Sequence, residues 1–325
     1  MIKTYFYNHE DHTMYHDVDF SEIKELLATP NNLLWIDMYD TTESELHFIG
    51  DLFDFHPLAL EDCLQQSPRA KIDKYEDHHF FVFHALKYFE EAEEEDEISS
   101  IELDVFIGSN YIVTIHPMAL SAVGKVARIS LKSTELMERG PEYLLYQIID
   151  NIIDDTFPII ERIGERIDQL EESIFFNHGD FLMEESLALK TTIVLMRKVL
   201  IPQRHIFANM TGRYSFFVNT DNAPYFIDLA DNLNTILDTV NTYRDLINNS
   251  METYYSIVNA RTNEKITILT IISIIMMPLT VITGFFGMNV ALPGEAHPYA
   301  VWYILLGMAA LVLAMLAYFR YRRLI

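Results

Sequence analysis

The chain has 325 residues, half of them hydrophobic, and a formal net charge of −25. So strong an excess of acidic residues argues against nucleic acid as a partner, because its phosphates need Lys and Arg. The single cysteine, Cys63, excludes an intrachain disulfide and a cysteine-rich metal cluster. The beginning, "MIKTYFYNHEDH", lacks an apolar core, so we expect no secretory signal.

Residues 1–116 mix strand and helix patterns and are predicted to form a first α/β subdomain. Four short segments rich in aromatic and β-branched residues are typical of strands: "LLWIDMYD", "HHFFVFHALKYF", "ISSIELDVFIG" and "NYIVTIHP". Between them, "TTESELHFIGDLF" and "HPLALEDCL" have helical spacing. The acidic run from Glu90 to Glu97 is expected to be a solvated hairpin loop, with a cation site as the alternative.

Three histidines near the beginning, His9, His12 and His16, are a candidate transition-metal site. Neither helical nor strand spacing brings their rings together, so we expect an exposed segment instead. No glycine-rich phosphate loop or nucleophile elbow occurs, and we therefore expect no enzyme.

Residues 117–222 are predicted to form a helical subdomain. The stretch "PEYLLYQIIDNIIDDTFPIIERIGERIDQLEESIF" repeats apolar residues at steps of three and four, and "MEESLALKTTIVLMRKVLIPQRHIF" is its expected antiparallel partner. Pro224 suits the first turn of the next helix. No glycine follows until Gly284, and Pro278 is the only further proline before Phe286. An unbroken helix of these 63 residues would be about 95 Å long.

The end of this helix and a second apolar segment predict a transmembrane hairpin. Residues 266–286 and 300–319 are each close to the roughly 20 residues that span a bilayer, and a loop at 287–299 joins them. For one such segment alone, a buried soluble helix is the alternative. Lys and Arg flank the hairpin at 261, 265 and in the tail 320–325, whereas the loop has none. The positive-inside rule therefore places both termini in the cytoplasm.

A polar stripe runs along the long helix at alternating steps of four and three, the coiled-coil period of 3.5. Its members are Asp231, Thr235, Asp238, Thr242, Asp245, Asn249, Glu252, Ser256, Asn259, Asn263, Ile266, Thr270, Ser273, Met277, Thr280 and Gly284. The stripe is interpreted either as the wet side of an amphipathic helix or as the lining of a water-filled axis. Hydroxyls inside the membrane would alternatively bond their own backbone or pack against another helix.

Only a homo-oligomer can enclose such an axis, and Ile266 and Met277 would then be apolar constrictions that gate by dewetting. Gly287, Met288 and Asn289 follow the stripe and would form the outer mouth and selectivity filter. Gly287 is expected to end the helix in the left-handed conformation. A ring of Asn289 amides would accept hydrogen bonds from hydrated Mg²⁺, which sheds its waters reluctantly.

The segment "MPLTVITGFFGMN" resembles the end of the first transmembrane helix in the CorA family of divalent-cation channels. The resemblance continues through "WID", "HPLALED", "YLLYQIID", "PYFIDLAD", "TYRD" and "RTNE". It implies a homopentamer in the inner (plasma) membrane with an α+β cytoplasmic domain, an α/β/α funnel. A stalk helix (223–265) would lead into the pore-lining helix, with the second span peripheral. Transport of Mg²⁺, with Co²⁺ and Ni²⁺, would be passive, without an organic cofactor.

The resemblance also implies roles for individual residues. Pore positions would be Asn289, Thr280, Met277, Leu269, Ile266, Asn263 and Glu252, to which the stripe adds Ser273 and Thr270. Cytoplasmic Mg²⁺ would close the channel by binding between subunits, at Asp62 and Asp228 with Glu61 and Asp150 as secondary ligands.

The sequence departs from the family pattern in two places. Phe286 stands where the family usually has Tyr, and the loop lacks the acidic Met-Pro-Glu-Leu of many members. Glu295 is then the only acidic residue in the loop that is available to attract external cations. A ZntB-like zinc transporter, proton-coupled or not, is an alternative, and a membrane-anchored oligomeric sensor without transport is a more remote one. The intact Gly-Met-Asn favours Mg²⁺.

Overall fold

The computed structural model describes residues 1–29, 31–89, 98–176, 179–210, 221–288 and 299–322. The chain divides into two compact units, Met1–Ser250 and Met251–Ile325. The acidic run 90–97, Asn289 and Glu295 lie outside the described residues, so the expectations for them stay predictions.

In the first unit, the described residues form one mixed sheet of seven strands in the order β2-β1-β3-β7-β6-β5-β4. The strands are β1 (Ile2–Asn8), β2 (Thr13–His16), β3 (Leu33–Tyr39), β4 (Lys71–Lys74), β5 (His79–Tyr88), β6 (Ile98–Ile107) and β7 (Tyr111–His116). Only β3 and β7 pair in parallel, and the other pairs are antiparallel. The four predicted strands are confirmed, whereas β1, β2 and β4 were not predicted.

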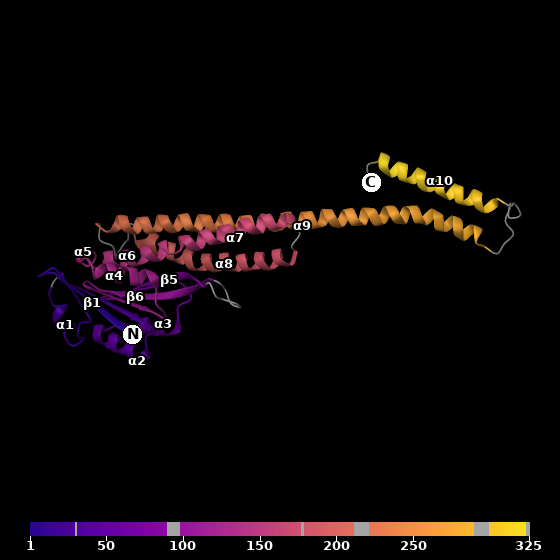
Figure 1. Ribbon diagram of the computed structural model, residues 1–325. Coiled ribbons are helices and arrows are strands. Elements are labelled where there is room, and N and C mark those ends of the chain that lie inside the picture. Colours follow the sequence, from indigo (N-terminus) through magenta and orange to yellow (C-terminus); the bar gives the residue numbers. More distant parts are fainter. Residues whose placement is uncertain (30, 90–97, 177–178, 211–220, 289–298, 323–325) are drawn as a thin grey trace. The chain divides into compact units, whose positions relative to one another are not determined.

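Helices cover both faces of this sheet (Figure 1). On one face lie α1 (Ile23–Leu26), α2 (Glu43–Phe53) and α3 (Pro57–Gln65), which share a buried core with the sheet. On the other lie α4 (Ser121–Ser130), α5 (Glu135–Glu138), α6 (Pro141–Asp154), α7 (Phe157–Phe176) and α8 (Gly179–Met210). Phe207 of α8 stacks on Phe83 of β5 with ring centroids 5.7 Å apart. The first unit is therefore an α/β/α sandwich.

The helical stretch from Pro141 to Phe176 is interrupted, although its apolar spacing is continuous. It forms α6 and α7, with a break at Asp155 and Thr156. Pro158 explains the break, because its ring restricts the preceding residue and it lacks the N–H that a helix interior requires. Because of the break, α6, which carries Asp150, is a separate helix from α7.

The predicted long helix is confirmed as α9 (Ala223–Phe286), 64 residues with Pro278 inside it. Within the first unit its buried side chains recur at steps of three and four residues from Phe226 through Leu229, Leu233 and Ile236 to Val240, and Ile247 follows seven residues later. Polar contacts also hold it there. Arg197 of α8 donates to the Asn241 side chain, and the Ser250 hydroxyl donates to Glu171 of α7 at 3.0 Å.

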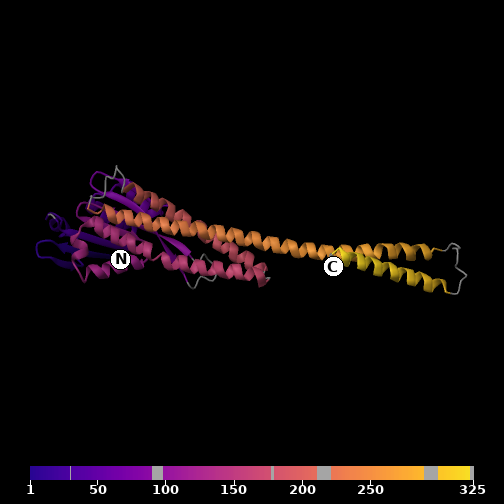
Figure 2. The ribbon, with the colours of Figure 1, turned by 90° about the horizontal axis from the view of Figure 1, so that it is seen from above.

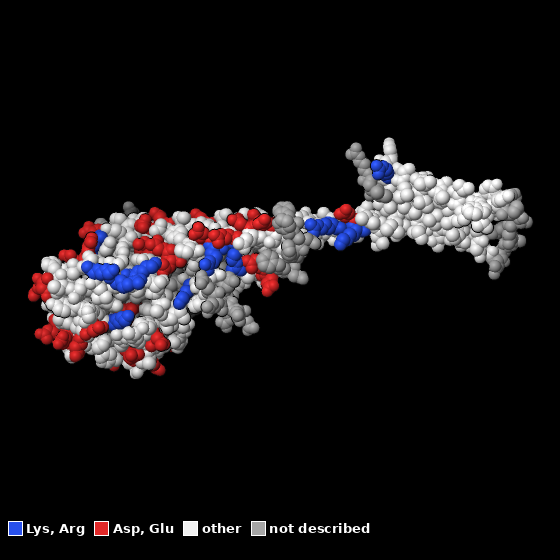
Figure 3. Space-filling model, in the orientation of Figure 1, with Lys and Arg blue, Asp and Glu red and all other residues white. Residues whose placement is uncertain are grey.

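In the second unit, α10 (Ala300–Tyr321) lies beside the C-terminal part of α9 (Figures 1 and 2). The less exposed residues of each helix form one stripe, on α9 Ile271, Ile275, Pro278, Leu279 and Ile282, and on α10 Ile304, Met308, Leu311, Val312, Met315 and Phe319. The rest of this apolar surface is exposed and free of charged groups (Figure 3). Both helices are long and apolar enough to cross a membrane.

A buried polar network ties β3 to β7 and generates a stability prediction. Asp37 accepts hydrogen bonds from the Thr114 hydroxyl at 2.7 Å and from His116 Nε2 at 3.0 Å, and all three residues are buried. Asp37→Ala strands both donors, so we expect the free energy of unfolding to fall by about 2–4 kcal/mol. Urea unfolding of the detergent-purified protein, followed by circular dichroism, measures this. The control Asp51→Ala, on the exposed side of α2, should change it by less than about 0.5 kcal/mol; equal effects would contradict the prediction.

Candidate cation pathway and regulatory site

The polar stripe of the first unit lies on the exposed side of α9. All six members from Asp231 to Asn249 are exposed, as is Glu252 just beyond the unit, whereas the intervening apolar residues pack against the rest of the unit. Four of them are acids seven residues apart: Asp231, Asp238, Asp245 and Glu252. Asp245 is paired with Arg244 at 2.8 Å. In one protomer this face therefore behaves as the wet side of an amphipathic helix.

The stripe continues on the exposed side of α9 in the second unit. Ile266, Thr270, Ser273, Met277, Thr280 and Gly284 are all exposed. At about 100° of rotation per residue, they lie nearly opposite the α9 residues that pack against α10. Met277 is 72% exposed. Within one protomer, α10 therefore does not cover the membrane hydroxyls.

The hydroxyls on this face donate hydrogen bonds to backbone carbonyls of α9 itself, as one of the sequence alternatives expected. Thr270 donates to Ile266 O at 2.8 Å, Ser273 to Leu269 O at 2.9 Å, and Thr280 to Met276 O at 2.9 Å. Each hydroxyl oxygen keeps lone pairs that can accept a further hydrogen bond or bind a cation. The exposed face of α9 thus presents oxygen acceptors, which suit a cation or its hydration water.

Gly287 ends α9 in a different way from the one expected. Its N–H donates to Thr283 O at 2.9 Å. Its φ angle does not lie in the left-handed region, in contrast to the φ angle of Gly140. A Cβ at Gly287 would lie 2.9 Å from the Thr283 carbonyl oxygen, which is too close for a side chain. Glycine is required here for close approach of the backbone, so the expected left-handed conformation was wrong.

Two of the predicted regulatory carboxylates are neighbours. Burial, followed by the charges of Asp154 and Asp228, raises the pKa of Asp150 to about 6. Burial and the charges of Asp150 and Asp228 raise the pKa of Tyr146 to about 12. These carboxylates on α6 and α9 offer a concentration of oxygen ligands, and their mutual repulsion would be relieved by a hard cation such as Mg²⁺.

The other two regulatory candidates lie on α3, where His56 caps the helix and Pro57 occupies its first turn. Asp62 Oδ2 is 2.5 Å from Lys71 Nζ, and Glu61 accepts a hydrogen bond from Gln65 at 2.9 Å. They line a cavity of about 460 Å³ that includes neither Asp150 nor Asp228. Within the described part of one protomer, no three His, Cys, Asp or Glu residues converge to hold a metal.

Sequence reasoning missed a buried acidic pair on β6, beneath this cavity. Glu102 accepts a hydrogen bond from the Ser67 N–H at 3.0 Å, and Asp104 is only 3% exposed. Burial and the neighbouring Glu102 raise the pKa of Asp104 well above its usual range. Burial and Asp104 likewise raise the pKa of the Cys63 thiol. The alternation in "IELDVFI" was the available clue, because it places both acids on the same buried face of a strand.

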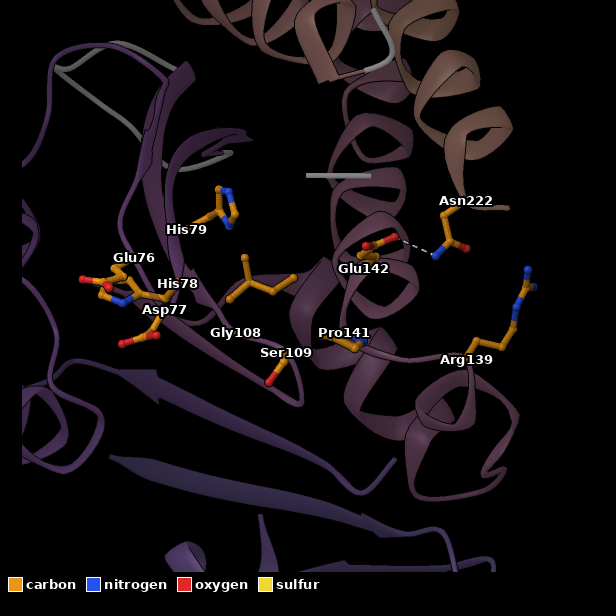
Figure 4. A pocket seen from close by; sticks show the side chains of 11 residues that line it. Glu76, Asp77, His78, His79, Gly108, Ser109, Arg139, Pro141, Glu142 and Asn222 are labelled. Carbon is orange, nitrogen blue, oxygen red and sulfur yellow. Dashed lines mark hydrogen bonds between the residues drawn. The ribbon is translucent and has the colours of Figure 1, made fainter. Parts of the chain in front are cut away.

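Two further polar sites contain none of the predicted pore or regulatory residues. Figure 4 shows a pocket of about 370 Å³ where Asn222 donates to Glu142 at 2.9 Å. Its Arg139 points away and donates to the Tyr225 hydroxyl at 2.6 Å, which fixes the start of α9. The rings of His9 and His12 lie with centroids 5.6 Å apart, but His12 and His16 are exposed, as expected, and among the described residues no three metal-ligating side chains converge.

The fold defines a class of membrane protein with a large extramembrane domain. It consists of an α/β/α unit and one helix that continues from this unit into an exposed apolar hairpin. The family model described as CorA-like Mg²⁺ transporter protein matches residues 30–323. The chain belongs to this family, which confirms the resemblance seen in the sequence.

Individual relatives of the chain are also named as metal transporters. The chain is 32% identical over 286 residues to the putative metal ion transporter YfjQ of Bacillus subtilis, covering 88% of each. It is 30% identical to the cobalt/magnesium transport protein CorA of Thermotoga maritima, covering 85% of this chain and 78% of that one. The CorA magnesium transporter structure from Methanocaldococcus jannaschii matches 98% of this chain and 97% of its own, with a TM-score of 0.84 at 23% identity, and shows the same fold. Relatives named as transporters fit the expectation of a non-enzyme.

The raised pKa of Asp150 generates a pH-dependent prediction. The folded protein holds this proton more tightly than the unfolded chain, so the carboxyl destabilises the fold as pH rises from about 4 to about 6. Without Mg²⁺ at pH 7.5, Asp150→Asn should therefore raise the free energy of unfolding by about 1 kcal/mol, allowing for solvent screening of this half-buried group. Urea unfolding at pH 7.5 and pH 4 measures the difference, which should vanish at pH 4. An equal gain at both pH values would contradict the assignment.

Proposed function

We propose that the protein is the subunit of a passive divalent-cation channel, with α9 lining the pathway. The observation that carries this proposal is the stripe of residues on the exposed side of α9, opposite α10 in the second unit, which is polar or small except at Ile266 and Met277. The apolar surface beside the stripe suits lipid, whereas exposed Thr and Ser oxygens suit water and ions. Family membership supports the same activity.

A homopentamer would bring five such stripes around one axis. Exposed apolar residues beside the regulatory acids support an assembly in which copies cover one another. Leu58, 60% exposed, lies on α3 near Asp62, and Ile227, 47% exposed, precedes Asp228 on α9. Pairing these two faces between neighbours would bring Asp62 close to the neighbour's Asp228 and Asp150, and would complete a carboxylate site for regulatory Mg²⁺.

Gating in this proposal follows from repulsion between carboxylates. Acids every seven residues on α9 would face their own copies around the axis. Bound Mg²⁺ between subunits would offset the repulsion and favour the closed assembly, as far as it binds that state more tightly. Loss of Mg²⁺ would let the segment between Ile266 and Met277 wet and conduct. The basic flanks at 261, 265 and 320–323 support cytoplasmic termini in the plasma membrane, with transport driven by the membrane potential.

The donors on the stripe favour Mg²⁺ over Zn²⁺. Apart from the Met277 thioether, the described stripe offers oxygen, which hard cations prefer, whereas zinc sites use mainly nitrogen and sulfur. Flux into liposomes at fixed potential, with Mg²⁺, Co²⁺, Ni²⁺ and Zn²⁺ compared with and without a pH gradient, tests the function. Zn²⁺ flux that requires the pH gradient would support the proton-coupled zinc transporter, and no flux of any ion would support the sensor.

The outer mouth provides the first mutational prediction. Asn289→Ala removes the amide that would accept hydrogen bonds from the hydrated ion, so saturable Mg²⁺ uptake should be lost while assembly persists. Uptake into liposomes is measured beside the oligomer mass from light scattering. Asn289→Gln, which keeps an amide, should retain part of the uptake. Wild-type uptake by assembled Asn289→Ala would rule out a selective amide ring.

The constriction offers a matched pair of neighbouring methionines. Met277 lies on the stripe, whereas Met276 is exposed but turned away from it by about 100°. Met277→Ser should ease wetting and raise basal Mg²⁺ flux several-fold, because the polar hydroxyl lowers the cost of water entry. Met276→Ser should leave flux within about twofold of wild type. Equal effects of the two changes, at matched protein in the liposomes, would remove Met277 from the pathway.

A further inference from the structure

Lys71 occupies the position beside Asp62 that a regulatory cation would need. Its Nζ lies 2.5 Å from Asp62 Oδ2 and 2.8 Å from Asp73 Oδ2, and all three side chains are only partly exposed, between 31% and 39%. The ammonium also lies over the Phe80 ring, 5.6 Å from its centroid. Burial alone would lower the pKa of Lys71, but hydrogen bonds to Asp62 and Asp73 raise this pKa to about 12. Lys71 is therefore a permanent cation at this carboxylate.

A carboxylate that is already paired with an ammonium is a weaker ligand for a second cation, because the two positive charges repel one another at short range. We propose that Lys71 is a tethered competitor that sets the Mg²⁺ concentration at which Asp62 takes part in channel closure. The inference rests on the proposed regulatory role of Asp62. It adds a residue that tunes the site without being a ligand of the metal.

Asp73 makes the exchange feasible. Lys71 and Asp73 lie on the same strand, β4, and their contact does not depend on Asp62. When Mg²⁺ takes Asp62, Lys71 can keep its bond to Asp73, so its charge is not left buried without a partner. The ammonium thus has one partner that it can release and one that it retains. Glu61 and Tyr75 line the same cavity and keep it polar after the exchange.

The opposite role for Lys71 predicts the opposite sign. If Lys71 orients Asp62 for the metal, its removal disorders the ligand and weakens Mg²⁺ binding. If it competes, its removal leaves the carboxylates of the cavity less neutralised and strengthens Mg²⁺ binding. The direction of the shift in Mg²⁺ sensitivity therefore separates a competing from an orienting lysine.

The test uses the full-length protein with Lys71→Met and Lys71→Gln, so that one misfolded variant does not decide it. Two curves are measured against Mg²⁺ on the cytoplasmic side: inhibition of flux in liposomes, and protection of the purified protein from protease. Both neutral variants should lower the half-maximal Mg²⁺ concentration by about tenfold in both curves, the size expected for removing one charge at short range. Lys71→Arg, which keeps the charge, should stay within about threefold of wild type.

Lys74→Met is the charge-matched control, because Lys74 lines the same cavity. Its shift should be less than half that of Lys71→Met, and an equal shift would overturn the proposal by showing that the overall charge of the cavity is responsible. Unchanged or raised half-maximal concentrations for both neutral Lys71 variants would also overturn it. In an Asp62→Asn background, Lys71→Met should have a much smaller effect, because the carboxylate for which the ammonium competes is absent.

The two proposals fail in different ways. If wild-type flux is insensitive to cytoplasmic Mg²⁺, the proposed regulation fails and this inference fails with it. If wild-type inhibition weakens in Asp62→Asn and in Asp228→Lys but is unchanged in both neutral Lys71 variants, the regulatory site stands and only the competitor role of Lys71 fails.

Discussion

The structure depends on one helix, α9, that keeps one side exposed over its whole length. Apart from its two ends and the turn before Pro278, α9 satisfies its own backbone hydrogen bonds, so it suits water and lipid alike. What changes along it is the partner of its apolar side, the sandwich in the first unit and α10 in the second. The opposite side stays exposed in both. Side chains at a spacing averaging 3.5 residues thus form a single continuous surface.

The electrostatics of the first unit follow from crowding carboxylates. With a net charge of −25, the chain places Asp150 beside Asp154 and Asp228, and buries Asp104 beside Glu102. Such pairs oppose folding at neutral pH, since burial and like charges both disfavour the ionised form. A divalent cation bound between carboxylates reverses that cost. In the proposed channel, regulatory Mg²⁺ would stabilise the arrangement around Asp150 in this way.

The two kinds of oxygen in the protein suit different tasks. Along the second unit, hydroxyls whose protons bond to the helix backbone present weak, neutral acceptors, which suit an ion that must leave again. In the first unit, charged carboxylates suit an ion that must stay bound. Lys71 contacts one oxygen of Asp62. In the proposed channel, passage and sensing would thus be separated by ligand charge as well as by place.

The sequence by itself determined the elements whose signals are local: the four central strands, the hydrophobic hairpin, the uninterrupted α9 and its polar stripe. Only the tertiary structure decided which distant residues meet. The short strands β1, β2 and β4 are held by pairing with partners elsewhere in the sheet, and Asp62 meets Lys71 because α3 packs beside β4. Asp150 and Asp228 meet because α9 packs against α6, 78 residues further along the chain. Periodicity specifies which side of an element is buried, but the partner of that side is set by sheet order and helix packing, which local sequence does not encode.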